Sequence, residues 1–466
     1  MSFLLNASLI QVYPGPKPLP FIGNLHQIPK SNHTATFTKW ASRYGEVIYM
    51  KVISREYIIL NSASAAVELL EKRGSLYGSR PQTIMAAELV GRSKAFTLIP
   101  YGQRYRMYRK YLRNAISTNS LSEHWAYLED QSANLLEALL RNPDGFREHI
   151  RRSVGAVALR LSYGFQHEDG IDHYINLADE LAQITREALE PGRWLVDSLP
   201  WLRYVPSWFP GAHFKKWAYW ARVRCDEFTN APFEAAKSNL SNDSTVFSFT
   251  SRALQMLEQD GNEPSSEGQD IIKYVSASIY AGGTDTTSSL ISTFFLMMAC
   301  YPEVQRKAQA EIDQITGRSR LPLASDEERL PYLSCVIKEL HRIHPTVPLV
   351  PRTAEHDDEY RGYRIPKQAY ILVNVWAMAH DPTVYPDPNR FNPDRFVSGK
   401  DSQPQMDPRE ISFGLGRRRC PGINLANTVS FLYISRILAM FDILKPLDES
   451  GLEYTPEVDF TLEHTS

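Results

Sequence analysis

One stretch near the C-terminus decides the fold of this chain: Phe413-Gly414-Leu415-Gly416-Arg417-Arg418-Arg419-Cys420-Pro421-Gly422. Its first two glycines allow a tight turn and a close approach of the backbone to a flat ligand. Cys420 directly precedes a predicted helix, and Pro421 suits the first helical position. The positive end of that helix is expected to lower the pKa of the Cys420 thiol and to stabilise a thiolate. Taken alone, the stretch also fits a buried structural cysteine beside a basic loop.

Two more residues of this stretch suit a large planar ligand that carries anionic groups. Gly422 leaves space where a side chain would collide with a macrocycle. Arg418 is placed to pair with an anionic group beside the thiolate. The stretch therefore predicts a ligand site around Cys420.

Composition narrows the function classes. The chain has 466 residues, 43% of them hydrophobic, which is enough for a large core. Its formal net charge is -2, so no global basic field favours nucleic-acid binding. The four cysteines lie far apart, without a Cys-x-x-Cys pair, which indicates no disulfide framework and suits a reducing compartment. No linker, repeat or low-complexity run divides the chain, so we expect one large domain over residues 14–466.

Helical patterns dominate the chain. The longest runs over residues 270–300 and would be about 45 Å long at 1.5 Å per residue. Another covers residues 331–344, and a last helix follows Cys420. Residues 47–53 and 57–61 read as a β-hairpin, and residues 370–374 as a strand. The predicted fold is mainly α with a small β portion.

Two more constellations are ambiguous by themselves. Glu339 and Arg342 stand at i and i+3 on one helix, where they can pair, which on its own describes an ordinary surface pair. Gly282 and Gly283 lie midway along the long helix, where each costs about 1 kcal/mol relative to alanine. Such a pair indicates either a packing kink or a groove beside a ligand.

The cysteine stretch matches Phe-x-x-Gly-x-Arg-x-Cys-x-Gly at every fixed position, and so resembles the haem-binding signature of the cytochrome P450 superfamily. The resemblance implies haem b with Cys420 as the axial thiolate. It makes Phe413, Gly416, Arg418 and Gly422 cofactor-binding residues. It extends from the Pro14-Gly15-Pro16 hinge to the last helix. Family members usually continue beyond residues 459–461 with a further strand, so we expect that strand to be truncated here.

The resemblance also assigns roles outside the cysteine stretch. Arg395, in Phe391-Asn392-Pro393-Asp394-Arg395-Phe396, is implied to complete a buried network with Glu339 and Arg342. Asp285 and Thr286 match the acid–alcohol pair that feeds protons to iron-bound dioxygen. The residues implied to hold the haem propionates are Tyr105, which stands where the family has Trp, together with Arg109 and Arg352.

The implied reaction is insertion of one oxygen atom from dioxygen into an apolar small molecule. Electrons are implied to come from NADPH through a flavoprotein reductase. The sequence as a whole resembles filamentous-fungal members of the family that act in secondary metabolism. Basic residues are expected to contribute to the reductase-docking face: Arg104, Arg106, Arg109, Lys110, Arg113, Arg417 and Arg419. A haem-thiolate isomerase or dehydratase that needs no dioxygen, and a non-catalytic haem-binding protein, stay open as alternatives.

Membrane association is expected from two segments. Residues 1–13 form a short apolar segment, too short for a transmembrane helix of about 20 residues. Residues 191–211 combine Trp194, Trp201, Trp208 and Phe209 with prolines, which suits a membrane interface, although a core or substrate-lid role is also compatible. The expected location is the cytosolic face of the endoplasmic reticulum membrane, with the cytoplasm as the alternative.

Overall fold

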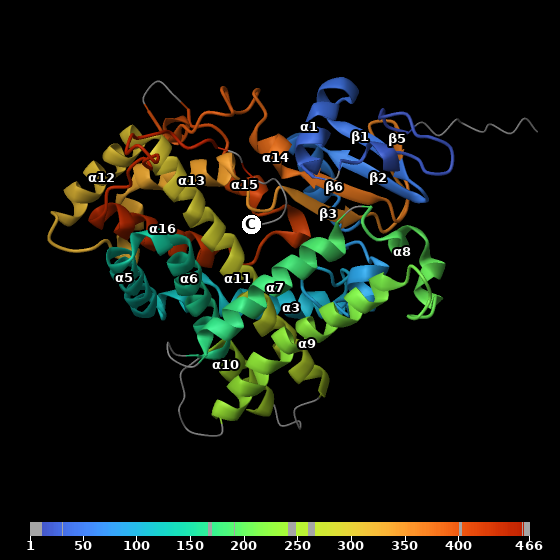
Figure 1. Cartoon of the computed structure of the whole chain (residues 1–466), viewed down its shortest axis with the longest axis horizontal. Helices are drawn as coiled ribbons and strands as arrows, with labels where there is room; N and C mark the ends of the chain where they lie inside the picture. The colour runs from blue at the N-terminus through green and yellow to red at the C-terminus, as the bar shows by residue number, and fades with distance from the viewer. Residues whose placement is uncertain are drawn as a thin grey trace, which may run out of the picture.

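The computed structural model describes residues 12–29, 31–165, 170–190, 192–240, 248–259, 266–399, 403–458 and 460. Most of this part of the chain is helical (Figure 1). Its α-helices are α1 (His33–Tyr44), α2 (Ala63–Val67), α3 (Gln103–Ala115), α4 (Thr118–Ser122), α5 (Trp125–Arg141), α6 (Phe146–Tyr163), α7 (Ile171–Leu189), α8 (Leu195–Ser198), α9 (His213–Leu240), α10 (Phe249–Gln259), α11 (Ser266–Cys300), α12 (Pro302–Thr316), α13 (Pro331–Ile343), α14 (Val375–Ala379), α15 (Arg409–Ser412) and α16 (Ile423–Met440).

The strands form a small sheet at one side of the molecule, next to α1 (Figure 1). Its order is β1-β2-β6-β3, with β2 and β6 parallel and the other neighbours antiparallel. A separate hairpin pairs β4 with β5. The bounds are β1 (Val47–Val52), β2 (Arg55–Leu60), β3 (Leu349–Thr353), β4 (Asp358–Tyr360), β5 (Tyr363–Ile365) and β6 (Tyr370–Asn374).

Helix α11 runs through the helical part and packs against α3, α6, α7 and α16. With 35 residues it extends over about 52 Å. Helix α16 follows the cysteine stretch and packs on α5, α11 and α12. By length and composition α16 would suit a membrane span, but 61% of its apolar window is buried inside the protein, which is typical of a core helix.

The prediction of a mainly α fold with a small β portion is confirmed. The predicted hairpin and the strand at residues 370–374 are β1, β2 and β6, and the long helix begins four residues before the predicted start. Of the helices with 11 or more residues, α1, α6, α9, α10 and α12 were not predicted. The predictions for residues 1–13 fall almost wholly outside the described residues.

Candidate active site

The cysteine stretch forms a loop between α15 and α16 that turns twice through left-handed backbone. Gly414 has φ +76° and Gly416 has φ +60°, conformations that favour glycine. A Cβ on Gly416 would lie 1.9 Å from the carbonyl oxygen of Leu70. The loop therefore packs directly against the backbone of the helical turn η2 (Glu68–Lys72). The N–H of Cys420 donates to the Phe413 carbonyl at 2.7 Å and closes the loop. These contacts fix where the Cys420 sulfur lies.

Two details of the loop correct the sequence predictions. Helix α16 begins at Ile423 with Gly422 as its N-cap, so Pro421 precedes the helix and does not occupy its first position. Burial raises the pKa of Cys420, and the Gly422 N–H and Arg109 only partly oppose this. The protein alone therefore favours the thiol, because burial outweighs the helix start, whereas metal coordination deprotonates a thiol outright.

Three buried guanidinium groups gather beside the loop: Arg80, Arg352 and Arg418. Arg418 donates to the carbonyls of Gly78 at 2.6 Å and Ile99 at 2.5 Å. Burial and repulsion by Arg418 lower the pKa of Arg352 to about 9, and burial lowers that of Arg418 to about 10. Arg80 was missed by the sequence analysis, because a single arginine in a loop carries no periodic signal.

Tyr105 and Arg109 lie at this cluster, and both donate hydrogen bonds to the cysteine loop. The Tyr105 hydroxyl donates to the carbonyl of Arg417 at 2.9 Å, and Arg109 donates to that of Arg419 at 2.5 Å. The Arg418 guanidinium lies 3.7 Å from the centre of the Tyr105 ring. Tyr105 therefore holds Arg418 through a cation–π contact, and its assignment to a haem propionate stays a prediction.

This donor set fits haem. In the described part of the chain no Asp or Glu pairs with Arg80, Arg352 or Arg418, and Nε of Arg80 is buried without a partner. Three such cations call for anionic groups, and two propionates supply them. A Cβ on Gly422 would lie 3.7 Å from the Cys420 sulfur, and one on Gly282 would meet nothing within 4 Å. Cys420 thus offers a sulfur ligand with room for a flat group beside it.

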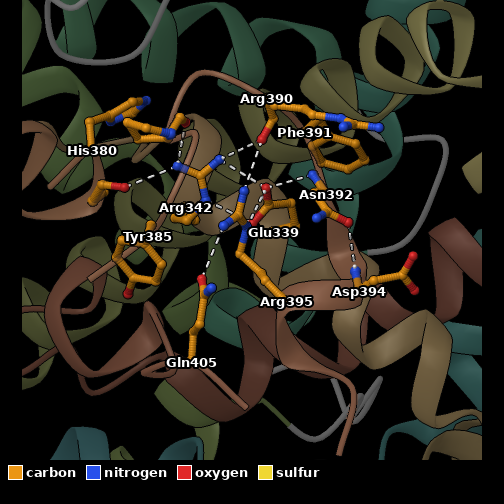
Figure 2. Close-up of polar contacts among 12 residues, drawn as sticks. Glu339, Arg342, His380, Tyr385, Arg390, Phe391, Asn392, Asp394, Arg395 and Gln405 are labelled. Carbon is orange, nitrogen blue, oxygen red and sulfur yellow. Dashed lines mark hydrogen bonds and ion pairs between the residues drawn. The ribbon is translucent and has the colours of Figure 1, made fainter. Parts of the chain in front are cut away.

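Glu339, Arg342 and Arg395 form a buried ion network (Figure 2). Arg342 makes two parallel hydrogen bonds of 2.8 Å to the Glu339 carboxylate, and Arg395 Nε lies 3.1 Å from the same carboxylate. Glu339 and Arg342 have 0% exposed side chains and Arg395 has 2%. The structure brings together the three residues that the sequence analysis grouped.

The other N–H groups of the two arginines donate hydrogen bonds to the segment that precedes the cysteine loop (Figure 2). Arg342 donates to the carbonyls of Ala379 and Pro388, and Arg395 donates to Pro386 and to the Gln405 side chain. The network therefore ties α13 to the segment between α14 and α15. Because α15 leads directly into the cysteine loop, this network supports the loop that carries Cys420.

The paired glycines of α11 lie across from the start of α16. A Cβ on Gly283 would lie 3.3 Å from Ala158 Cβ and 4.0 Å from Leu425 Cδ2, so α11, α6 and α16 approach closely here. The Thr286 hydroxyl donates to the Gly282 carbonyl at 2.8 Å. Asp285 is half-buried next to it. The predicted acid–alcohol pair thus lies at the point where α11 passes the beginning of α16.

Tyr280 is a packing residue of α11. Tyr280 is fully buried, its ring stacks on Phe228 of α9 with centroids 4.7 Å apart, and its hydroxyl donates to the carbonyl of Tyr174 on α7. Its side chain therefore joins α11 to α7 and α9.

His341 is a buried titratable residue within the Glu339–Arg342 turn. Its ring packs on Phe413 with centroids 5.0 Å apart, and its Nε2 is buried with no hydrogen-bond partner in the part of the chain that the structure describes. Burial, aided by Arg409, lowers the pKa of His341 to about 4. The unfolded chain takes up this proton near pH 6.5, whereas the folded chain resists it, so stability is lost as pH falls below about 6.5.

We expect His341→Leu to make the protein less sensitive to acid. Between about pH 7 and pH 5 the histidine costs about 2 kcal/mol of unfolding free energy, which the leucine variant retains. Denaturant titrations at both pH values measure this difference. His213→Leu, at an exposed position, serves as the control. An equal acid effect in the His341 variant and the wild type would contradict the assignment.

Comparison with known proteins agrees with this geometry. The family model for Cytochrome P450 matches residues 13–464. The chain belongs to the cytochrome P450 family. Family membership implies haem ligated by a cysteine thiolate, dioxygen, a redox partner and a small-molecule substrate for this cytochrome P450.

Curated relatives of this cytochrome P450 are fungal monooxygenases. Cytochrome P450 monooxygenase 208 of Postia placenta is 37% identical over 454 residues, covering 96% of this chain and 86% of the relative. Cytochrome P450 monooxygenase claR of Ampulloclitocybe clavipes is 38% identical, covering 96% and 83%. Cytochrome P450 monooxygenase ppsD of Aspergillus oryzae is 37% identical, covering 95% and 85%.

Proposed function

We propose that this chain is a haem-thiolate monooxygenase of fungal secondary metabolism that inserts one oxygen atom into a largely apolar molecule. The observation that carries the proposal is Cys420, held in a closed loop beside three buried arginines that have no carboxylate partner among the described residues. The relatives named as monooxygenases argue against the isomerase, dehydratase and carrier alternatives.

Each residue has a defined task in this proposal. Cys420 would supply the sulfur ligand of the haem iron, and Arg80, Arg352 and Arg418 would neutralise the haem propionates. Bound through a thiolate, haem supplies the activation of dioxygen for oxygen insertion. Thr286 holds a hydroxyl proton toward the Gly282 carbonyl, and its oxygen keeps lone pairs that can accept another proton. Asp285, one residue away, relays protons to that hydroxyl.

The optical spectrum of the reduced protein with carbon monoxide tests the proposal. Wild-type protein is expected to show the strongly red-shifted Soret band of thiolate ligation, and Cys420→Ala is expected to lack it. Cys335→Ala is the matched control, because Cys335 is a buried cysteine of α13 outside the cysteine loop, and this variant should keep the band. A Cys420→Ala protein that kept the band would overturn the proposal.

The electrons are proposed to come from an NADPH-dependent flavoprotein reductase that docks on α3 and the cysteine loop. Two residues of the basic set expected from the sequence make contacts within the protein. Arg104 pairs with Asp270 at 2.5 Å, and Arg109 donates to the Arg419 carbonyl. The remaining members of the set are exposed: Arg106, Lys110, Arg113, Arg417 and Arg419.

Charge reversal at Arg113 is expected to weaken reductase-supported turnover. Because exposed charges act mainly on encounter rates, we expect a loss of about threefold to tenfold at low salt that shrinks as salt is added. Turnover measured across a salt series tests this. Lys216→Glu on α9, another exposed cation, is the control. Unchanged turnover and salt dependence in Arg113→Glu would exclude this docking face.

A membrane-facing surface is proposed around α8 and the segment that follows it. Large apolar side chains are exposed there: Leu195 54%, Trp201 61%, Tyr204 74%, Trp208 79% and Phe209 51%. Ser54, in the turn between β1 and β2, and Arg55, the first residue of β2, donate hydrogen bonds to backbone carbonyls of α8. The patch therefore extends from a braced part of the fold and suits the cytosolic face of the endoplasmic reticulum membrane.

Liposome flotation of the double variant Trp201→Ser and Trp208→Ser tests this surface. Removing two interfacial indoles is expected to cut the membrane-bound fraction severalfold. The double variant Leu444→Ser and Leu452→Ser removes comparable exposed apolar area elsewhere, 72% and 67% exposed, and should float like wild type. Equal flotation of all three proteins would count against the proposal.

A further inference from the structure

Tyr105 is held in one orientation on the face of α3 that meets the cysteine loop. It is 1% exposed, and its ring stacks on Phe96 with centroids 5.3 Å apart and an interplanar angle of 24°. The Arg418 guanidinium lies 3.7 Å from the centre of the same ring. With the ring fixed by these two contacts, the hydroxyl donates to the Arg417 carbonyl at 2.9 Å. A phenol has one proton to donate, so this proton is committed to the backbone of the loop.

Arg109 makes a second contact of the same kind. It lies four residues after Tyr105, and residues with this spacing share one face of a helix. Its Nη1 donates to the carbonyl of Arg419 at 2.5 Å. The two acceptors, Arg417 and Arg419, stand three residues and one residue before Cys420. Two donors on one helix therefore hold two nearby peptide groups of the loop just before its cysteine.

The hydrogen-bonded contact between α3 and the cysteine loop (residues 413–422) consists of these two bonds within the described residues. The bonded residues lie 312 and 310 positions apart, so the bonds join two distant segments of the chain. The Cys420 N–H closes the loop on itself by donating to the Phe413 carbonyl at 2.7 Å. The loop therefore has a shape of its own, and the two side chains of α3 tie that shape to the helical part of the fold.

We propose that Tyr105 and Arg109 are positioning residues that hold the Cys420 sulfur in place through the backbone of the cysteine loop. This role is additional to the propionate contacts that the family resemblance implies for both residues. Groups that orient a metal ligand from behind commonly tune the metal that it binds. The inference rests on the proposed function, because the exact place of the sulfur matters only for a bound iron.

Tyr105→Phe tests this role, because it keeps the ring against Phe96 and Arg418 and removes only the hydrogen bond. In the reduced protein with carbon monoxide, the thiolate-type band of the variant should convert to the form without thiolate ligation about three- to tenfold faster than in wild type. The haem reduction potential should be higher in the variant, because a displaced thiolate donates less charge to the iron. Hydrogen–deuterium exchange of a peptide covering residues 413–422 should be faster. Arg109→Met should change the same three quantities in the same directions.

Tyr108→Phe is the matched control. Tyr108 lies on the same helix, is 0% exposed and accepts a hydrogen bond from Nε of Arg104 at 3.0 Å, so its hydroxyl does not hold the loop. This variant should keep wild-type values in all three measurements. Wild-type values in Tyr105→Phe, or equal changes in Tyr108→Phe, would overturn the inference. A wild-type protein without the thiolate-type band would instead overturn the proposed function, and the exchange measurement would still report whether Tyr105 holds the loop.

Discussion

Replacement of Glu339 by glutamine is expected to prevent accumulation of folded, haem-loaded protein. The variant keeps the shape of the side chain but leaves Arg342 and Arg395 buried without a counter-charge. Breaking a buried pair in this way costs about 3–5 kcal/mol, a large part of the total of about 5–15 kcal/mol that stabilises a protein. The free energy of unfolding and the yield of the thiolate-type carbon monoxide band measure the effect.

An exposed pair on another helix provides the comparison. Glu137 and Arg141 pair at i and i+4 on α5, with side chains 58% and 75% exposed. Solvent screens such a pair, so Glu137→Gln should leave folding and haem content unchanged. Wild-type stability in Glu339→Gln would show that the network does not support the loop.

The sequence predicted the parts of the site whose partners are close in the chain. The turns of the cysteine loop follow from Gly414 and Gly416, whose φ values are positive as the pattern required. The pairing of Glu339 with Arg342 follows from helical spacing. Arg395 lies 56 residues beyond Glu339, and no local pattern joins them, so its inclusion came from the family resemblance alone.

The direction of side chains and their depth of burial could not be predicted from the sequence. The hydroxyl of Tyr105 donates to the backbone carbonyl of Arg417, a residue 312 positions away, which no local pattern indicates. Arg104 looked like a free surface cation until the fold placed Asp270 beside it. The pKa direction of Cys420 was predicted wrongly, because a helix start can be read from sequence but the depth of burial cannot. Each error concerns a contact set by the tertiary fold.

A single methyl group at Gly416 is expected to displace the cysteine loop. Alanine at φ +60° is strained by about 1–2 kcal/mol, and its Cβ would lie 1.9 Å from the carbonyl oxygen of Leu70. That oxygen belongs to the backbone and cannot rotate away, so the loop or η2 must shift. We expect Gly416→Ala to lose most of its haem on purification and to convert to a form without thiolate ligation.

Gly414 separates backbone strain from collision. Its φ of +76° imposes similar strain on alanine, but the nearest atom to a built Cβ is the Arg418 carbonyl oxygen at 3.6 Å, an ordinary contact. Gly414→Ala should therefore cost about 1–2 kcal/mol and keep its thiolate band. Haem content per protein and the carbon monoxide spectrum compare the two variants. Equal haem retention in both variants would show that the close approach of Gly416 to Leu70 does not position Cys420. Loss of haem from Gly416→Ala alone would identify that contact as the one that positions the Cys420 sulfur.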